Sequence, residues 1–266
     1  MNIHTIILAA GKGTRMNTNL PKVMQPLGGH TLISHVIKTA KKNSKNITVV
    51  VGHQKDSLKE HIASIDSNIK TADQDDQLGT AHAVKTAAHL IKEDERVLVL
   101  YGDVPLISHK TIEALIKSGQ ECTLLAMKLA DPTGYGRIVT NEQNLALRII
   151  EQKDASEDER KIQDVFTGIL LIDGGLLWSA LDEINNQNAA KEYYLTDLVE
   201  ILSTKGVKIN CIQADPTEVL GANNKYELHE LESILRKMSA KKLLQKGITL
   251  LDATRVDVRG EVEAGK

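Results

Sequence analysis

The chain has 266 residues, enough for one large domain with an appendage or for two smaller domains, and its 41% hydrophobic and 26% charged residues are ordinary for a soluble protein. A net charge of −2 and 3% aromatic residues argue against binding to nucleic acid or to a membrane surface. No apolar run is long enough to span a membrane, and the first is too short for a signal peptide. Two separated cysteines, Cys122 and Cys211, are typical of buried reduced thiols, so we expect a cytoplasmic protein.

Apolar periodicity in the first 65 residues predicts alternating strands and helices. The uninterrupted apolar run at 6–10 predicts a buried strand of a parallel sheet, and β-branched residues at 47–51 predict a second. Between them, Thr31 is a candidate N-cap for a helix that runs to residue 40 with a 3.6-residue apolar period. A polar helix after residue 53 completes a strand–helix–strand–helix start, which is typical of a doubly wound α/β fold.

A glycine-rich loop with three cations follows the first strand. Gly11 and Gly13 let backbone N–H groups approach an anion, and the cations are Lys12, Arg15 and Lys22. The spacing does not fit the P-loop, which needs four residues between its glycines, and the dinucleotide fingerprint needs a small residue where Met16 stands. From these residues alone, a phosphate cradle and a plain turn between strand and helix both remain open.

A polar loop at 74–80 leads into a predicted helix at 81–90. Gly79 or Thr80 can cap that helix, which explains the Gly-Thr pair structurally. The functional alternative is that the amide of Gln74 and the backbone of the glycine offer donors and acceptors to a nucleobase edge.

Two further residues are candidate ligands of a metal ion. Asp103 comes shortly after the third predicted strand, at 96–100, and therefore lies at the same edge of the sheet as the glycine-rich loop. It is either the first residue of an Asx-turn or a ligand of Mg²⁺, which proteins bind through one or two carboxylates. Asn223, in a Gly-Ala-Asn-Asn string, is either a turn residue or a neutral oxygen ligand beside that carboxylate.

The rest of the chain continues the alternation of strands and helices. Glycines and a proline at 131–138 predict a bend, and residues 151–161 form a charged loop. The periodicity predicts strands at 122–127, 166–172 and 207–212, and helices at 109–118, 176–184, 197–202 and 226–246.

Three strings together resemble one enzyme family. They are Leu-Ala-Ala-Gly-Lys-Gly-Thr-Arg-Met with Leu-Pro-Lys over 8–22, Gln-Leu-Gly-Thr at 77–80, and Glu-Tyr-Tyr-Leu-Thr-Asp at 192–197. The first resembles the signature of sugar-1-phosphate nucleotidyltransferases. The combination is similar to the N-terminal uridyltransferase domain of bacterial bifunctional N-acetylglucosamine-1-phosphate uridyltransferase/glucosamine-1-phosphate acetyltransferases, and the similarity covers essentially the whole chain.

The resemblance implies a Rossmann-like nucleotide-diphospho-sugar transferase fold with a mixed, mostly parallel central sheet, followed by a C-terminal linker helix. It implies Mg²⁺-dependent transfer of UMP from UTP to N-acetylglucosamine 1-phosphate, which yields pyrophosphate and UDP-N-acetylglucosamine for peptidoglycan and lipopolysaccharide synthesis. A phosphate monoester is mostly a dianion at neutral pH, since its second pKa is about 6, so no catalytic base is expected.

The resemblance also implies roles for particular residues. The implied catalytic residues are Arg15, Lys22 and Asp103, and the implied Mg²⁺ ligands are Asp103 and Asn223. The implied nucleotide-binding residues are Leu8, Ala9, Ala10, Gly11, Gly13, Thr14, Arg15, Lys22, Gln74, Gly79 and Thr80. The implied sugar-binding residues are Tyr101, Gly102, Asp103, Gly136, Glu151, Phe166, Glu192, Tyr194 and Thr196.

One residue departs from the family pattern. The family usually carries Asn before Thr-Gly, where this chain has Phe166, so one polar contact to the sugar is lost and sugar selectivity stays open. The alternatives are therefore a nucleotidyltransferase that accepts another hexose 1-phosphate, or a non-catalytic sensor of UDP-sugars. A sensor does not need the charge-neutralising set of Arg15, Lys22, Asp103 and Asn223, so the presence of this set argues against a sensor.

The resemblance divides the chain into three parts. Residues 1–226 would form the nucleotidyltransferase domain, 227–247 a linker helix, and 248–266 the start of a truncated left-handed β-helix. Because no hexapeptide repeats follow, we expect no acetyltransferase activity in this chain. The full-length family forms homotrimers, whereas a monomer is an option for the shorter chain.

Overall fold

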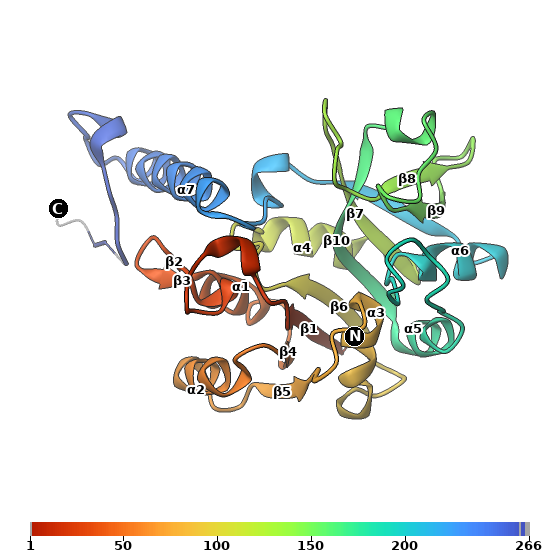
Figure 1. Ribbon diagram of the computed structural model, residues 1–266. Coiled ribbons are helices and arrows are strands. Elements are labelled where there is room, and N and C mark those ends of the chain that lie inside the picture. Colours follow the sequence, from red (N-terminus) through yellow and green to blue (C-terminus); the bar gives the residue numbers. More distant parts are fainter. Residues whose placement is uncertain (1, 261, 264–266) are drawn as a thin grey trace.

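The structure, a computed structural model, describes residues 2–260 and 262–263 and is centred on one mixed sheet. The sheet contains β1 (Ile3–Ala9), β4 (Asn46–Val51), β5 (Lys70–Asp73), β6 (Arg96–Tyr101), β7 (Cys122–Lys128), β8 (Arg137–Thr140), β9 (Ala146–Ile150), β10 (Asp164–Asp173) and β11 (Ile209–Gln213). The order along the main path is β11-β7-β10-β6-β1-β4-β5, and the β8–β9 hairpin joins β10 (Figure 1). A separate small hairpin pairs β2 (Pro26–Leu27) with β3 (His30–Thr31).

The middle of the sheet is parallel and almost entirely buried. β1 lies between β4 and β6 and runs parallel to both, and every residue of β1 is buried. β10 runs antiparallel to β6 and β7, while β11 is parallel to β7. The main path is therefore mixed and mostly parallel, and this prediction is confirmed.

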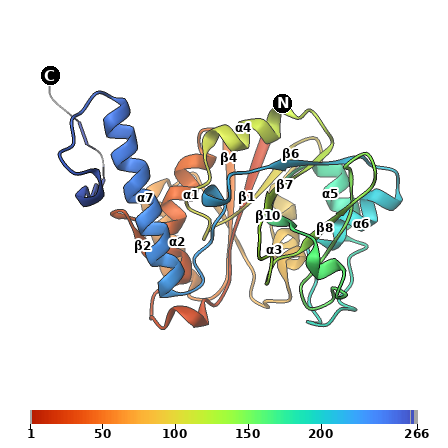
Figure 2. The same cartoon turned by 90° about the horizontal axis from the view of Figure 1, so that it is seen from above.

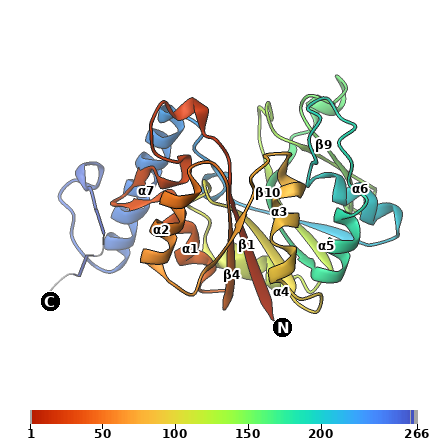
Figure 3. The same ribbon diagram turned by 60° about the horizontal axis from the view of Figure 1, so that its bottom comes forward.

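Helices cover both faces of the sheet because alternate residues of each strand point to opposite sides. Leu8 and Val50 pack towards one group of helices, while Ile7 and Val49 pack towards the other. In Figure 3 the helices at 80–86, 174–181 and 197–204 lie on one side of β1, and the helices at 32–40 and 55–65 lie on the other. The first group is α3 (Thr80–Thr86), α5 (Gly174–Leu181) and α6 (Asp197–Thr204), and the second is α1 (Leu32–Ala40), α2 (Lys55–Ile65) and α4 (His109–Lys117).

The predicted strands at 6–10, 47–51 and 96–100 correspond to β1, β4 and β6. β5, the β2–β3 hairpin and the β8–β9 hairpin were not among the predicted elements. β5 reads Lys-Thr-Ala-Asp and lies at the edge of the sheet, where polar residues face solvent and the apolar signal is weak. The bend predicted at 131–138 leads directly into β8.

A long helix, α7 (Lys225–Gln245), lies against the N-terminal part of the chain (Figure 2). Its Leu231 packs with Met16, Leu27 and Leu32 in a third hydrophobic cluster. After α7, Arg259 pairs with Glu232 at 3.1 Å, so the last described segment folds back on this helix. Residues 248–266 were predicted to begin a β-helix. In the described part of this segment the regular structure is one 3-10 turn, Ala253–Arg255. Residues 261 and 264–266 of the predicted β-helix start lie outside the described residues.

The loops after β1, β4, β5 and β6 meet at one edge of the sheet. Hydrogen bonds tie neighbouring segments there: Gly102 N–H donates to Leu8 O at 2.9 Å, and Gln74 N–H donates to Val51 O at 2.8 Å. This edge carries the glycine-rich loop, the 74–80 loop and Asp103. Among the helices in the described residues, none is both long and apolar enough to cross a membrane.

Candidate active site

A cavity of about 440 Å³ lies among the loops at this edge, and we call it the loop cavity. Gly13, Thr14 and Arg15 of the implied nucleotide-binding set are not among its lining residues; Thr14 and Arg15 are exposed in a 3-10 turn beside it. The other implied nucleotide-binding residues do line it: Leu8, Ala9, Ala10, Gly11, Lys22, Gln74, Gly79 and Thr80. The structure therefore brings most of this set together around one space.

A second cavity, of about 340 Å³, adjoins the first, and we call it the aromatic cavity. Four of the seven aromatic residues of the chain line it: Tyr101, Tyr135, Phe166 and Tyr194. The implied sugar-binding residues Gly136, Glu151, Glu192 and Thr196 line it as well, whereas Asp103 lines the loop cavity and Gly102 lines neither. Thr80, Tyr101 and Glu192 line both cavities, so the two spaces are neighbours.

Lys22, Asp103 and Asn223 form a charged cluster on the wall of the loop cavity. The Lys22 ammonium pairs with Asp103 Oδ2 and donates a hydrogen bond to Asn223 Oδ1 at 3.1 Å. The Lys22 and Asp103 side chains are only 17% and 14% exposed, which limits screening of this pair by water. The structure thus joins residues that are 201 positions apart in the chain.

The donor set of this cluster fits a hard divalent cation. A carboxylate oxygen and an amide oxygen converge on one cationic atom, the Nζ of Lys22, and oxygens of these two kinds are the ligands that Mg²⁺ prefers. No group of three or more His, Cys, Asp or Glu side chains placed to hold a metal occurs among the described residues. A site with two protein oxygens suits Mg²⁺, which keeps several waters and substrate phosphates as ligands.

The 74–80 loop is held by hydrogen bonds of its own side chains. Gln74 is buried, and its amide donates to Gly79 O at 3.0 Å. Gly79 is the residue before α3 and has a positive φ of 123°, and a Cβ there would lie 2.4 Å from Tyr193 O. The Thr80 hydroxyl does not cap α3 but accepts from Leu195 N–H at 3.0 Å. The structural explanation for this Gly-Thr pair is therefore the close approach of the Tyr193–Leu195 backbone.

Gln77 is a lining residue that was missing from the implied set. Its amide donates to Ala10 O at 2.9 Å, which links the 74–80 loop to the end of β1. Gln77 also lines the loop cavity. It belongs to the Gln-Leu-Gly-Thr string, and that string is the signal that could have identified it.

The two glycines of the opening loop have different structural reasons. Gly13 has φ 58°, and a Cβ there would lie 2.6 Å from Lys22 Cβ, so a larger residue would displace the side chain that reaches Asp103. Gly11 has no atom within 4 Å of such a Cβ, and it faces the loop cavity. Gly13 thus serves the fold and the placement of Lys22, whereas Gly11 leaves space open.

Substituting these two glycines should separate stability from binding. Gly13→Ala is expected to lower the free energy of unfolding by about 1–3 kcal/mol, because of its positive φ and the contact with Lys22. Gly11→Ala is expected to change it by less than about 0.5 kcal/mol while narrowing the cavity. Urea denaturation measures both, and equal destabilisation of the two variants would contradict this distinction.

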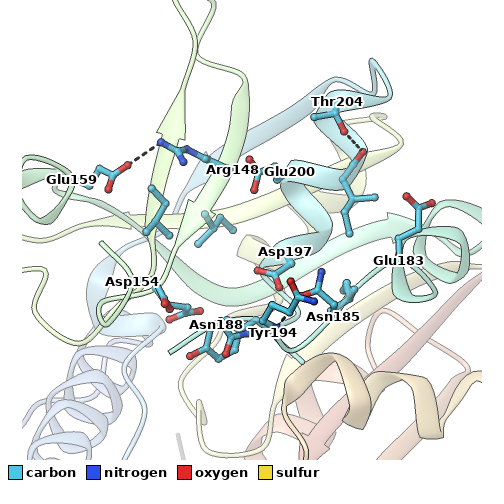
Figure 4. A pocket seen from close by; sticks show the side chains of 16 residues that line it. Arg148, Asp154, Glu159, Glu183, Asn185, Asn188, Tyr194, Asp197, Glu200 and Thr204 are labelled. Atoms are coloured by element: carbon cyan, nitrogen blue, oxygen red, sulfur yellow. Dashed lines mark hydrogen bonds and ion pairs between the residues drawn. The ribbon is translucent and has the colours of Figure 1, made fainter. Parts of the chain in front are cut away.

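An acidic cavity of about 550 Å³ adjoins the aromatic cavity and shares Glu151 and Tyr194 with it. Figure 4 shows Arg148 paired with Glu159 on one side of it, and Asp154 and Asp197 on the other. Burial raises the pKa of Glu151, whose carboxylate accepts a hydrogen bond from the Thr196 hydroxyl at 3.1 Å. Burial, with the nearby charges of Glu151, Glu200 and Asp154, raises the pKa of Asp197 to about 6.

Asp197→Asn should therefore stabilise the protein at high pH. The pKa of Asp197 rises from 3.8 to about 6 on folding, so its charge destabilises the folded state above pH 6 and has no effect below pH 4. We expect a gain of about 1–2 kcal/mol at pH 8, reduced by solvent screening, and none at pH 4. Thermal denaturation across this range, with the exposed Asp94→Asn as control, measures it; a gain that is independent of pH would contradict the assignment.

The mixed sheet, the cationic loop at its edge and the oxygen pair beside it suit an α/β protein that handles phosphate groups. A profile of the MobA-like NTP transferase domain family matches residues 5–166, and the chain belongs to this family. The chain is accordingly a nucleotidyltransferase.

Relatives agree with this assignment. The whole chain is 43% identical to a bifunctional protein GlmU of Idiomarina loihiensis and 44% identical to one of Cupriavidus pinatubonensis, and it spans 59% of the length of each. These matches confirm the predicted resemblance. A solved structure of a UDP-glucose pyrophosphorylase complexed with UDP-glucose has 19% sequence identity and a TM-score of 0.71, and the match covers 90% of this chain and 100% of that one, which confirms the fold.

Proposed function

We propose that the chain transfers a uridylyl group from UTP to N-acetylglucosamine 1-phosphate, with release of pyrophosphate. The observation that carries the proposal is that the loop cavity and the aromatic cavity share Thr80, Tyr101 and Glu192. A nucleotide in the first and a sugar in the second would be neighbours. The charged cluster of Lys22, Asp103 and Asn223 supports the placement of phosphates there.

The chain's own residues would act mainly by charge and position. The sugar phosphate is mostly dianionic at neutral pH and needs no base to become a nucleophile. Lys22 would neutralise the attacking and transferred phosphates, and Arg15 with the backbone of 11–14 would hold the leaving pyrophosphate at the rim of the loop cavity. Asp103 and Asn223 would hold Mg²⁺, which when bound stabilises charge on the α-phosphate.

Residues of the aromatic cavity would orient the sugar. Burial and the charges of Glu151 and Asp103 raise the pKa of Tyr101, so its hydroxyl stays protonated and can donate a hydrogen bond. Glu151 and Glu192 offer carboxylate oxygens to sugar hydroxyls. Such positioning holds the phosphate nucleophile in line with the bond that breaks.

A second candidate is transfer to a different hexose 1-phosphate, and Phe166 favours it. Phe166 lines the aromatic cavity and is 6% exposed, so a sugar hydroxyl facing this ring would find no hydrogen-bond partner in it. A sugar that presents an apolar group at this position would be accepted more readily.

The test is pyrophosphate release over a grid of nucleoside triphosphates and hexose 1-phosphates. Activity limited to UTP and N-acetylglucosamine 1-phosphate supports the first proposal, and use of several sugars supports the second. If the protein binds UDP-sugars but releases no pyrophosphate from any pair of substrates in the presence of Mg²⁺, both proposals are contradicted. A non-catalytic sensor of UDP-sugars would then be the remaining alternative.

A further inference from the structure

Glu227 holds the side chain of Asn223 through a network at the start of α7. Glu227 Oε2 accepts hydrogen bonds from the Asn223 backbone N–H at 2.7 Å and from the Asn223 amide Nδ2 at 3.1 Å. Glu227 Oε1 accepts from the Asn224 amide at 2.6 Å, and the Glu227 backbone N–H donates to Asn224 Oδ1 at 2.9 Å. One carboxylate thus fixes both asparagines.

This network determines which atom of the Asn223 amide faces the charged cluster. An amide carries one acceptor oxygen and one NH₂ group on opposite sides. Because the NH₂ group donates to Glu227, the oxygen points to the Lys22 ammonium, 3.1 Å away. An amide turned the other way would present N–H groups to a cation and repel it.

The same segment is also tied to Asp103. Ala222 N–H donates to the backbone O of Asp103 at 3.3 Å, so residues before α7 run beside the loop after β6. The two oxygens that converge on Lys22 therefore come from segments whose spacing is set by backbone contact, while the direction of the Asn223 oxygen is set by Glu227.

We propose that Glu227 is a positioning residue for a divalent-cation site formed by Asp103 and Asn223, in that it keeps the Asn223 oxygen turned towards the cation. The inference rests on the proposed function for its assignment of the cation. Glu227 does not itself contact the cation; it acts through the orientation of Asn223, as partners of ligating side chains do in metal sites.

Titration with Mn²⁺ alone, followed by the electron paramagnetic resonance of free Mn²⁺, tests this role without turnover. Glu227→Ala is expected to weaken Mn²⁺ binding about 10- to 100-fold. Glu227→Gln keeps an oxygen that can accept both bonds from Asn223, so its affinity should stay within about threefold of wild type. A Glu227→Gln affinity as weak as that of Glu227→Ala would mean that charge, not orientation, matters, and would overturn the proposal.

A matched variant separates this role from helix capping. The Asn224 side chain caps α7, so Asn224→Ala removes the cap but leaves the bonds between Glu227 and Asn223. We expect it to lower the melting temperature about as much as Glu227→Ala while changing Mn²⁺ affinity less than about threefold. Equal loss of Mn²⁺ affinity in both variants would overturn the proposal, as would an unchanged affinity in Glu227→Ala.

Failure of the proposed function gives a different result. In one outcome, the wild-type protein binds Mn²⁺, the Asp103→Ala variant does not, and the wild-type protein releases no pyrophosphate. This outcome would contradict the proposed uridylyl transfer but would leave the role of Glu227 standing. A wild-type chain whose Mn²⁺ binding does not depend on Asp103 would overturn the cation site and, with it, the inference on Glu227.

Discussion

Asp103→Ala is expected to lower kcat for UTP and N-acetylglucosamine 1-phosphate at least about a hundredfold while the protein stays folded. Asp103 supplies the only carboxylate oxygen that contacts the Lys22 ammonium among the described residues, and it is mostly shielded from water. Its loss removes the anionic ligand of the proposed cation site and leaves Lys22 with the Asn223 oxygen alone.

Steady-state pyrophosphate release measures this effect, and circular dichroism monitors folding. Asp158→Asn is the matched control, because Asp158 is an exposed carboxylate that pairs with Lys161 and lines none of the cavities described above. It should retain full turnover. Turnover of Asp103→Ala within a few-fold of wild type would remove Asp103 from the catalytic set.

Lys22→Ala is expected to cost at least about a hundredfold in kcat, for a different reason. The ammonium neutralises phosphates in the proposed reaction, and a truncated side chain leaves two repelling anions without a cation between them. Mn²⁺ affinity without nucleotide should rise rather than fall, because the Lys22 ammonium binds the same two oxygens that would hold the metal.

The change in Mn²⁺ affinity distinguishes the two variants, because the affinity should fall in Asp103→Ala and rise in Lys22→Ala. Lys12→Met is the control for lost charge, since Lys12 is an exposed cation of the same loop and does not line the loop cavity. It should change Mn²⁺ affinity less than about twofold. Direct competition between the Lys22 ammonium and Mn²⁺ for Asp103 and Asn223 would be contradicted if Lys22→Ala lowered the Mn²⁺ affinity. It would also be contradicted if Lys12→Met raised the Mn²⁺ affinity as much as Lys22→Ala does.

Sequence patterns predicted the interior of the fold better than its margins. The apolar runs that became β1, β4 and β6 were long and continuous because both faces of a parallel sheet are buried. β10 was predicted as a strand, but a strand buried on both faces carries no periodic sign of its direction, so its antiparallel pairing could not be predicted from that run. The β8–β9 hairpin is short and partly exposed, and its apolar pattern was too brief to recognise.

The sequence predicted those residues of the candidate site that belong to a specific family pattern. It did not predict the residues whose part in the site depends on contacts formed only in the folded chain. The family resemblance indicated Lys22, Asp103 and Asn223, and the structure brings these three together, while their roles stay predictions. The partnership of Glu227 with Asn223 could not be predicted, because Asn224 followed three residues later by Glu227 is also an ordinary helix start. The glycines of the opening loop could not be told apart either, since only the folded chain places Lys22 against Gly13.

The packing of α7 against the N-terminal hairpin bears on how the chain folds during synthesis. Met16 and Leu27 leave the ribosome long before Leu231, with which they share a hydrophobic cluster. Lys22 is likewise made 201 residues before its partner Asn223. Strands β1, β4 and β6 can pair earlier, because their residues are made first. A nascent chain that stops before α7 would contain every strand of the sheet but lack Glu227, so the proposed cation site would be completed only when the last helix is made.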